Sequence, residues 1–138
     1  MTVPPKGKAA EAPDYISPDG AEIRLVLRPE VEGVAHHSVC EAVFQPGQVS
    51  QAVRHRHVEE SWYVLDGAAD VWRKPPDGSP ATVTRLERGE ALNIPTGYEF
   101  QLRVVGGEKL RMLCSTAPPW PGPEEAIPVE GGLGAPTA

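Results

Sequence analysis

The chain has 138 residues, a length that fits one domain built around one hydrophobic core. Its formal net charge is -6, so its surface should repel nucleic acid and anionic membranes rather than collect them. No apolar run approaches the length of a membrane span, and residues 1–20 lack the apolar core of a signal peptide, so we expect a cytoplasmic protein. Cys40 and Cys114 form no CxxC pair or repeated spacing, which indicates two reduced, buried thiols rather than a zinc knuckle or a disulfide framework.

Both ends of the chain are rich in proline. Residues 1–20 carry few large apolar side chains, so they predict a flexible N-terminal arm that cannot bury enough surface to offset its ordering entropy. Residues 118–138 have a similar composition and predict a tail rich in Pro and Gly. Within that tail, Trp120 and residues 127–129 are the groups that would dock on the domain, where they would cover a pocket or a dimer seam.

Short segments with alternating apolar and polar residues predict an all-β domain over residues 21–117. Turn-forming clusters at 75–78 and 106–108 stand where hairpins should reverse, because Gly adopts positive φ and Pro interrupts a strand. No segment predicts a helix of three turns. The expected strands are 22–28, 38–45, 49–57, 60–66, 68–74, 81–86, 91–94, 98–105 and 109–115.

The segment 53–57 contains the first candidate functional residues. His55 and His57 are two apart on an expected strand, so both imidazoles should project from one face. Glu60 has the wrong parity for that strand, but a bend at 58–59 would start a new strand and return its carboxylate to the imidazoles. Two imidazoles and a carboxylate form the donor set of non-haem iron(II) sites and of catalytic zinc sites. We therefore predict one divalent transition metal, with Fe, Zn, Mn and Ni left open.

These residues resemble the first motif of the cupin superfamily, which runs from a glycine through His-x-His and a glutamate to a closing glycine. Here the motif spans residues 47–67 and contains the two histidines and Glu60. The second cupin motif, Gly, Pro-x-Gly and a late histidine, resembles residues 89–100. The resemblance covers residues 38–115 and implies a single small cupin-type barrel, that is, a double-stranded β-helix or jelly roll with flexible termini.

The last motif position departs from the family, because Phe100 stands where the fourth metal-ligating histidine is usual. Phe100 beside Trp62 would make one wall of the cavity apolar, and a coordination position would remain open for water or substrate. We place Tyr98 at the rim of the same substrate pocket.

Three other side chains are candidates for the missing ligand. His36 and His37 are preferred weakly, although both stand in an expected loop. Gln101 follows Phe100 directly and should point away from the interior.

The resemblance implies a wide range of functions, since dioxygenases, decarboxylases, isomerases, cyclases and plain ligand-binding barrels share this fold. We expect a metal-dependent enzyme, either a dioxygenase or a lyase, cyclase or isomerase, acting on a small, partly apolar metabolite. A general base is not evident, because Glu60 would be occupied by the metal. A metal-free binding or regulatory barrel and an accessory subunit of a biosynthetic enzyme stay open. A homodimer is expected, because open sheet edges need covering.

Overall fold

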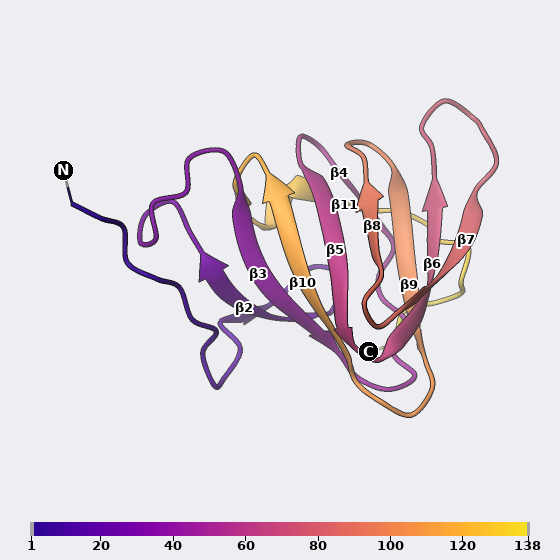
Figure 1. Ribbon diagram of the computed structural model, residues 1–138. Helices are drawn as coiled ribbons and strands as arrows, with labels where there is room; N and C mark the ends of the chain where they lie inside the picture. The colour runs from indigo at the N-terminus through magenta and orange to yellow at the C-terminus, as the bar shows by residue number, and fades with distance from the viewer. Residues whose placement is uncertain (1, 138) are drawn as a thin grey trace.

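The computed structural model describes residues 2–137, which form two facing antiparallel β-sheets (Figure 1). The strands are β1 (Tyr15–Ile16), β2 (Glu22–Leu27), β3 (Ser38–Phe44), β4 (Val53–His55), β5 (Glu59–Asp66), β6 (Ala68–Lys74), β7 (Thr82–Glu87), β8 (Ala91–Ile94), β9 (Glu99–Val105), β10 (Leu110–Ala117) and β11 (Ala126–Pro128). The six-stranded sheet has the order β1-β2-β3-β10-β5-β8, and the five-stranded sheet has the order β11-β4-β9-β6-β7. Within the described residues the only helical element is a single 3-10 turn, η1 (Pro123–Glu125), and no helix is long and apolar enough to cross a membrane. The all-β prediction is confirmed.

Alternation of side chains along β5 and β10 builds much of the core of the barrel. Along β10, Leu110 and Met112 point into the barrel and are almost fully buried. Leu113 points to the opposite face and is 40% exposed. Along β5, Trp62 and Val64 are buried, as their parity predicts. The inward faces of the two sheets therefore meet in one apolar core.

The register of the six-stranded sheet positions the side chains that matter for function. β10 lies between β3 and β5 and pairs with both. Neighbouring residues in register point to the same face of a sheet, so they form rows across it. Two such rows cross this sheet: Ser38, Thr116 and Glu60 in one, and Cys40, Cys114 and Trp62 in the next.

Strand β4 is much shorter than the expected strand 49–57. Before it, Ser50 is held by β9, because its backbone N–H donates to the Leu102 carbonyl and its hydroxyl accepts from the Leu102 N–H. After it, the chain turns away at Arg56, whose N–H donates to the Glu125 carbonyl. Contacts with β9 and with the C-terminal segment thus limit β4 to three residues.

Residues 7–16 of the N-terminal segment lie against β2, at the edge of the six-stranded sheet. β1 pairs with β2, and the Arg24 guanidinium donates to the carbonyls of Ala10 and Glu11. Gly7 lies so close to the Val26 carbonyl that a Cβ at this position would be 1.8 Å from its oxygen. Hydrogen bonds to β2 supply the ordering that the apolar content of this segment does not predict.

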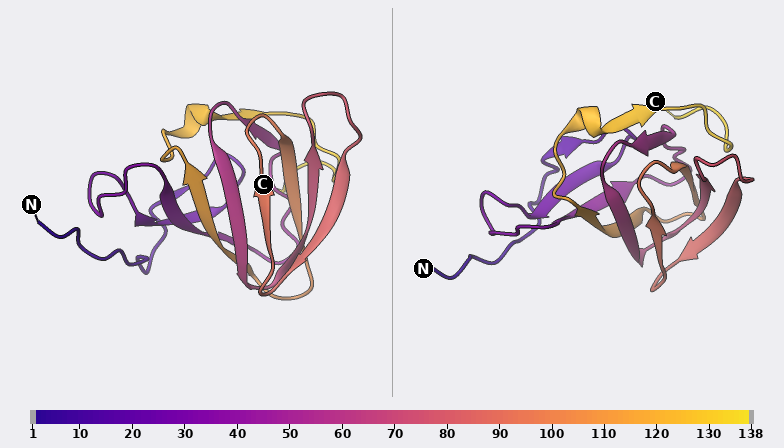
Figure 2. Two further views of the ribbon diagram at one scale, coloured as in Figure 1. Left: turned by 45° about the horizontal axis from the view of Figure 1, so that its top comes forward. Right: turned by 90° about the horizontal axis from the view of Figure 1, so that it is seen from above.

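The C-terminal segment crosses the outer side of the five-stranded sheet (Figure 2). β11 pairs with β4, and the Val129 N–H donates to the Ala52 carbonyl. The Gln101 side chain faces this segment, accepting from the Leu133 N–H and donating to the Gly134 carbonyl. Gln101 thus binds the C-terminal segment, and this contact explains how a polar side chain is only 1% exposed.

Candidate functional site

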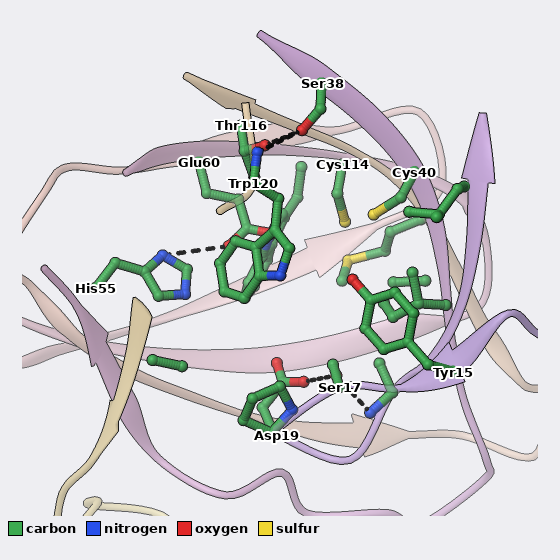
Figure 3. A pocket seen from close by; sticks show the side chains of 18 of the residues that line it. Tyr15, Ser17, Asp19, Ser38, Cys40, His55, Glu60, Cys114, Thr116 and Trp120 are labelled. Carbon is green, nitrogen blue, oxygen red and sulfur yellow. Dashed lines mark hydrogen bonds and ion pairs between the residues drawn. The ribbon is translucent and has the colours of Figure 1, made fainter. Parts of the chain in front are cut away.

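A cavity of about 60 Å³ lies inside the barrel against the six-stranded sheet (Figure 3). A single water needs only about 10–15 Å³ of such space, so the cavity admits more than one water. Most of its lining is apolar, and none of the described residues that line it is Lys or Arg. The lining residues that carry an N–H, O–H, S–H or carboxyl group are Tyr15, Ser17, Asp19, Ser38, Cys40, His55, Glu60, Trp62, Cys114, Thr116 and Trp120.

His55 and Glu60 form the polar centre of this cavity. The His55 Nδ1 atom lies 3.7 Å from Glu60 Oε2, which is too long for a hydrogen bond, and Nδ1 has no hydrogen-bond partner among the described residues. Burial lowers the pKa of His55 to about 4, while burial together with the charge of Asp19 raises the pKa of Glu60 to about 8. At neutral pH both groups are therefore uncharged, and they do not form an ion pair.

His57 does not reach this centre, so the prediction that both imidazoles share one face is wrong. β4 ends at His55, and the bend falls at residues 56–57 instead of 58–59. The His57 side chain is 73% exposed, and its Nδ1 atom lies 2.9 Å from Glu125 Oε1. Glu60 still faces the cavity, because it lies in β5 two residues before the buried Trp62 and therefore on the same face of the strand.

The donor set does not fit the three-ligand metal centre that the motif predicts. His55 and Glu60 supply two donors, and residues 2–137 hold no cluster of three or more His, Cys, Asp or Glu side chains that could bind a metal ion. Phe100 offers no donor at the fourth position, and neither His36 nor His37 lines the cavity. The residues as placed therefore lack the donors that tightly bound Fe or Zn requires.

The three predicted pocket residues have different positions. Trp62 is 3% exposed and lines the cavity. The Phe100 ring packs edge-on against His55, with the ring centroids 5.1 Å apart at an interplanar angle of 78°. It also packs edge-on against Trp62, with the centroids 5.6 Å apart. Tyr98 packs against the outside of the core cluster and does not line the cavity.

Sequence reasoning missed the lining residues of the N-terminal segment, among which Asp19 and Tyr15 carry titratable groups. The Asp19 side chain accepts a hydrogen bond from the Ser17 hydroxyl, and burial raises the pKa of the Asp19 carboxyl. The Tyr15 ring enters the wall from β1, where burial raises the pKa of its hydroxyl. Periodicity gives no signal for either residue, because the segment contributes backbone pairing rather than an alternating apolar face.

Trp120 closes the cavity from the C-terminal side. Its ring packs edge-on against His55 with the centroids 5.2 Å apart, and its backbone N–H donates to the Ser38 hydroxyl. The Ser38 hydroxyl also hydrogen-bonds the Thr116 hydroxyl, which stands in register with Glu60. The expected docking of Trp120 is therefore found, and the surface that it covers is the cavity.

Comparison with known proteins gives one family. The cupin domain family matches residues 40–116, which is more than half of the chain. An uncharacterized protein of Methanocaldococcus jannaschii is 27% identical over 106 residues, covering 77% of this chain and 80% of that protein.

Solved structures agree in fold. Oxalate decarboxylase from Bacillus subtilis superposes with a TM-score of 0.77 and 16% identity over 94% of this chain and 33% of that chain. The capsular polysaccharide assembling protein CapF from Staphylococcus aureus gives a TM-score of 0.68 and 13% identity over 80% of this chain and 32% of that chain. The chain thus spans about a third of both structures, and identities this low establish the fold alone. With the family match and both motifs in one barrel, the chain belongs to the cupin family.

Proposed function

We propose that this cupin binds a small organic amine in its barrel without requiring a bound metal. The observation that carries the proposal is the His55 Nδ1 atom, which is buried, has no partner among the described residues and lies beside the Glu60 carboxyl. A buried polar atom left unpaired costs roughly 1–3 kcal/mol, so a ligand that pairs with it gains affinity at this point.

The polar side chains favour a ligand that donates hydrogen bonds. A neutral imidazole has one accepting nitrogen, and the carboxyls of Glu60 and Asp19 add further acceptors. A protonated amine would also draw these carboxyls toward their ionised forms, because an opposite charge lowers a carboxyl pKa. An anionic ligand would meet no Lys or Arg in the described lining.

Aromatic rings in the cavity lining would also stabilise a bound amine. Trp62 and Trp120 line the cavity together with Tyr15. An ammonium group over such a ring is stabilised by about 0.5–2 kcal/mol, most strongly where water is excluded. The remaining lining, which includes Phe44 and Met112, suits a short apolar chain on the same ligand.

A metal-dependent enzyme is the second candidate, and one observation favours it. His55 and Glu60, two of the ligands that the first motif predicts, remain 3.7 Å apart and face the same cavity. Among related structures, one of Bacillus subtilis oxalate decarboxylase concerns its Mn(II) centres. In this second function His57 would leave Glu125 and turn inward to complete the ligand set with His55 and Glu60, and a metal held there would supply Lewis-acid chemistry.

Calorimetric titration with isobutylamine, isobutanol and isobutyrate tests the proposal, because the three probes share one apolar body and differ in charge. Protein treated with a chelator should bind the amine at least about tenfold more tightly than either of the others. Glu60→Gln should lower the affinity for isobutylamine by about tenfold or more. Ser61→Ala, on the outer face of the same strand, should leave that affinity unchanged. Equal affinity for isobutyrate would overturn the proposal. Binding that appears only after Fe, Zn, Mn or Ni is added would instead support the metal-dependent enzyme.

A further inference from the structure

Cys40 and Cys114 stand directly opposite each other on the neighbouring strands β3 and β10. Directly opposed residues of an antiparallel pair have Cα atoms about 4.5–5.5 Å apart. Disulfides bridge Cα separations of about 4.4–6.8 Å, so the register alone brings this pair into bonding range. Figure 3 shows the two sulfur atoms side by side at the cavity wall, and both cysteines are free thiols.

The surroundings of the two thiols differ in a way that suits a stepwise oxidation. Cys114 is 2% exposed, and the adjacent Cys40 thiol, together with burial, raises the pKa of its thiol. Cys40 is half-buried, so it is the thiol that a small oxidant reaches first. Their other neighbours in the register, Leu25 and Trp62, are apolar and offer neither sulfur a competing partner.

We infer that Cys40 and Cys114 are a redox-active pair that forms a reversible cross-strand disulfide with hydrogen peroxide. The Cys40 thiolate attacks one peroxide oxygen, the O–O bond breaks, and the released hydroxide takes up a proton to leave as water. The Cys114 sulfur then attacks the resulting sulfenic acid, the S–O bond breaks, and a second water leaves. Two thiols are oxidised to one disulfide while one peroxide is reduced to two waters.

The disulfide between Cys40 and Cys114 would change the cavity lining and stabilise the folded protein. It replaces two thiols of the lining by one disulfide and clamps β3 to β10 in the row that also contains Trp62. The clamp also restricts the unfolded chain, so the oxidised protein should melt at a higher temperature. This inference stands on the register of the two strands and does not depend on which ligand the cavity takes.

Treating the folded wild-type chain with hydrogen peroxide and measuring its intact mass provides the test. We expect a loss of two hydrogen atoms, no thiol left to titrate after denaturation, and full recovery with a dithiol reductant. Peptide mapping should join the segments around Cys40 and Cys114, and the protein should elute at an unchanged size. Cys40→Ser and Cys114→Ser should each fail to lose the two hydrogens.

Other results contradict the inference directly. Added oxygen atoms on the wild-type chain without loss of hydrogen would show that the two sulfurs do not meet. Disulfide-linked dimers would show that the accessible thiol reacts between molecules instead. The wild-type mass alone decides between these outcomes, so the test survives even where a serine variant folds poorly.

Discussion

The Nδ1 atom of His57 lies 2.9 Å from Oε1 of Glu125, and the other oxygen of this carboxylate accepts the backbone N–H groups of His57 and Val58. Glu125 is 3% exposed, so its carboxylate is shielded from water although the His57 ring is not. The residue comes from the turn η1 and fastens the C-terminal segment to the corner between β4 and β5. The second histidine of the motif therefore helps hold the segment that carries Trp120, whose ring covers the cavity.

Glu125→Gln should destabilise the protein by about 1–3 kcal/mol, because a neutral amide accepts the two backbone N–H groups less strongly than a carboxylate does. Urea unfolding followed by tryptophan fluorescence measures the loss. Glu124→Gln is the matched control, since that neighbouring side chain is exposed and only its backbone carbonyl binds Arg56. Equal stability of both variants would show that the carboxylate does not hold the segment.

A raised carboxyl pKa makes stability fall as pH increases. Burial and the charge of Asp19 raise the pKa of Glu60 from 4.5 to about 8 in the folded chain. Between these values the unfolded chain has lost this proton and the folded chain keeps it, so each rise in pH favours unfolding. His55, whose pKa is lowered from 6.5 to about 4, contributes the opposite slope, but only at lower pH.

Between about pH 7 and pH 8, therefore, the wild-type chain should lose stability that Glu60→Gln does not lose. Urea midpoints measured at several pH values in this window give the two slopes. Glu59→Gln, on the exposed side of the same strand, should keep the wild-type slope. Parallel slopes for the wild type and Glu60→Gln would mean that Glu60 is already ionised in the folded protein.

Most strands could be predicted from the sequence because their burial follows a simple period. β5 and β10 alternate along their lengths, and each packs one face on the core. Once Glu60 is assigned to such a strand, its parity fixes the inward direction of Trp62 as well. A single local rule therefore placed two residues of the cavity.

The position of His57 could not be predicted in this way, because parity holds only inside one strand. The end of β4 is set by Glu125, a residue far along the chain that captures the backbone beyond His55. Asp19 was missed for a related reason, since hydrogen bonds such as that from the Gln51 N–H to its carbonyl hold its segment against the barrel. Contacts between distant segments of this kind leave no periodic mark in the sequence.

Gly67→Ala should destabilise the barrel at the hairpin between β5 and β6. Gly67 has φ +81°, and a Cβ there would lie 2.4 Å from the Lys109 carbonyl oxygen. Gly89→Ala is the matched control, because Gly89 has φ +83° with no atom within 4 Å of the added carbon. Both variants carry the strain of positive φ, about 1–2 kcal/mol, so the excess loss at Gly67, measured by thermal unfolding, reports the collision alone. Equal losses would show that the Lys109 backbone moves aside without cost.

Phe100→His tests whether one more imidazole at the fourth motif position creates a tight metal site. Phe100 occupies the fourth motif position, and its ring centroid lies 5.1 Å from that of His55. The substitution adds an imidazole beside His55 and Glu60, and three such donors with an open position suit Zn²⁺. Replacing the buried phenyl ring with a polar imidazole should destabilise the variant by roughly 1–3 kcal/mol without metal.

Added Zn²⁺ should then raise the melting temperature of Phe100→His, because a ligand that binds only the folded state stabilises it. Phe100→Leu, which removes the ring without adding a donor, should show no such rise, and the wild type should respond far less than Phe100→His. Thermal scans with and without one equivalent of Zn²⁺, set beside metal analysis of the dialysed proteins, give the comparison. A wild-type chain that retains one equivalent as firmly as the variant would mean that His57 turns inward to bind metal, and the metal-dependent enzyme would then become the better account.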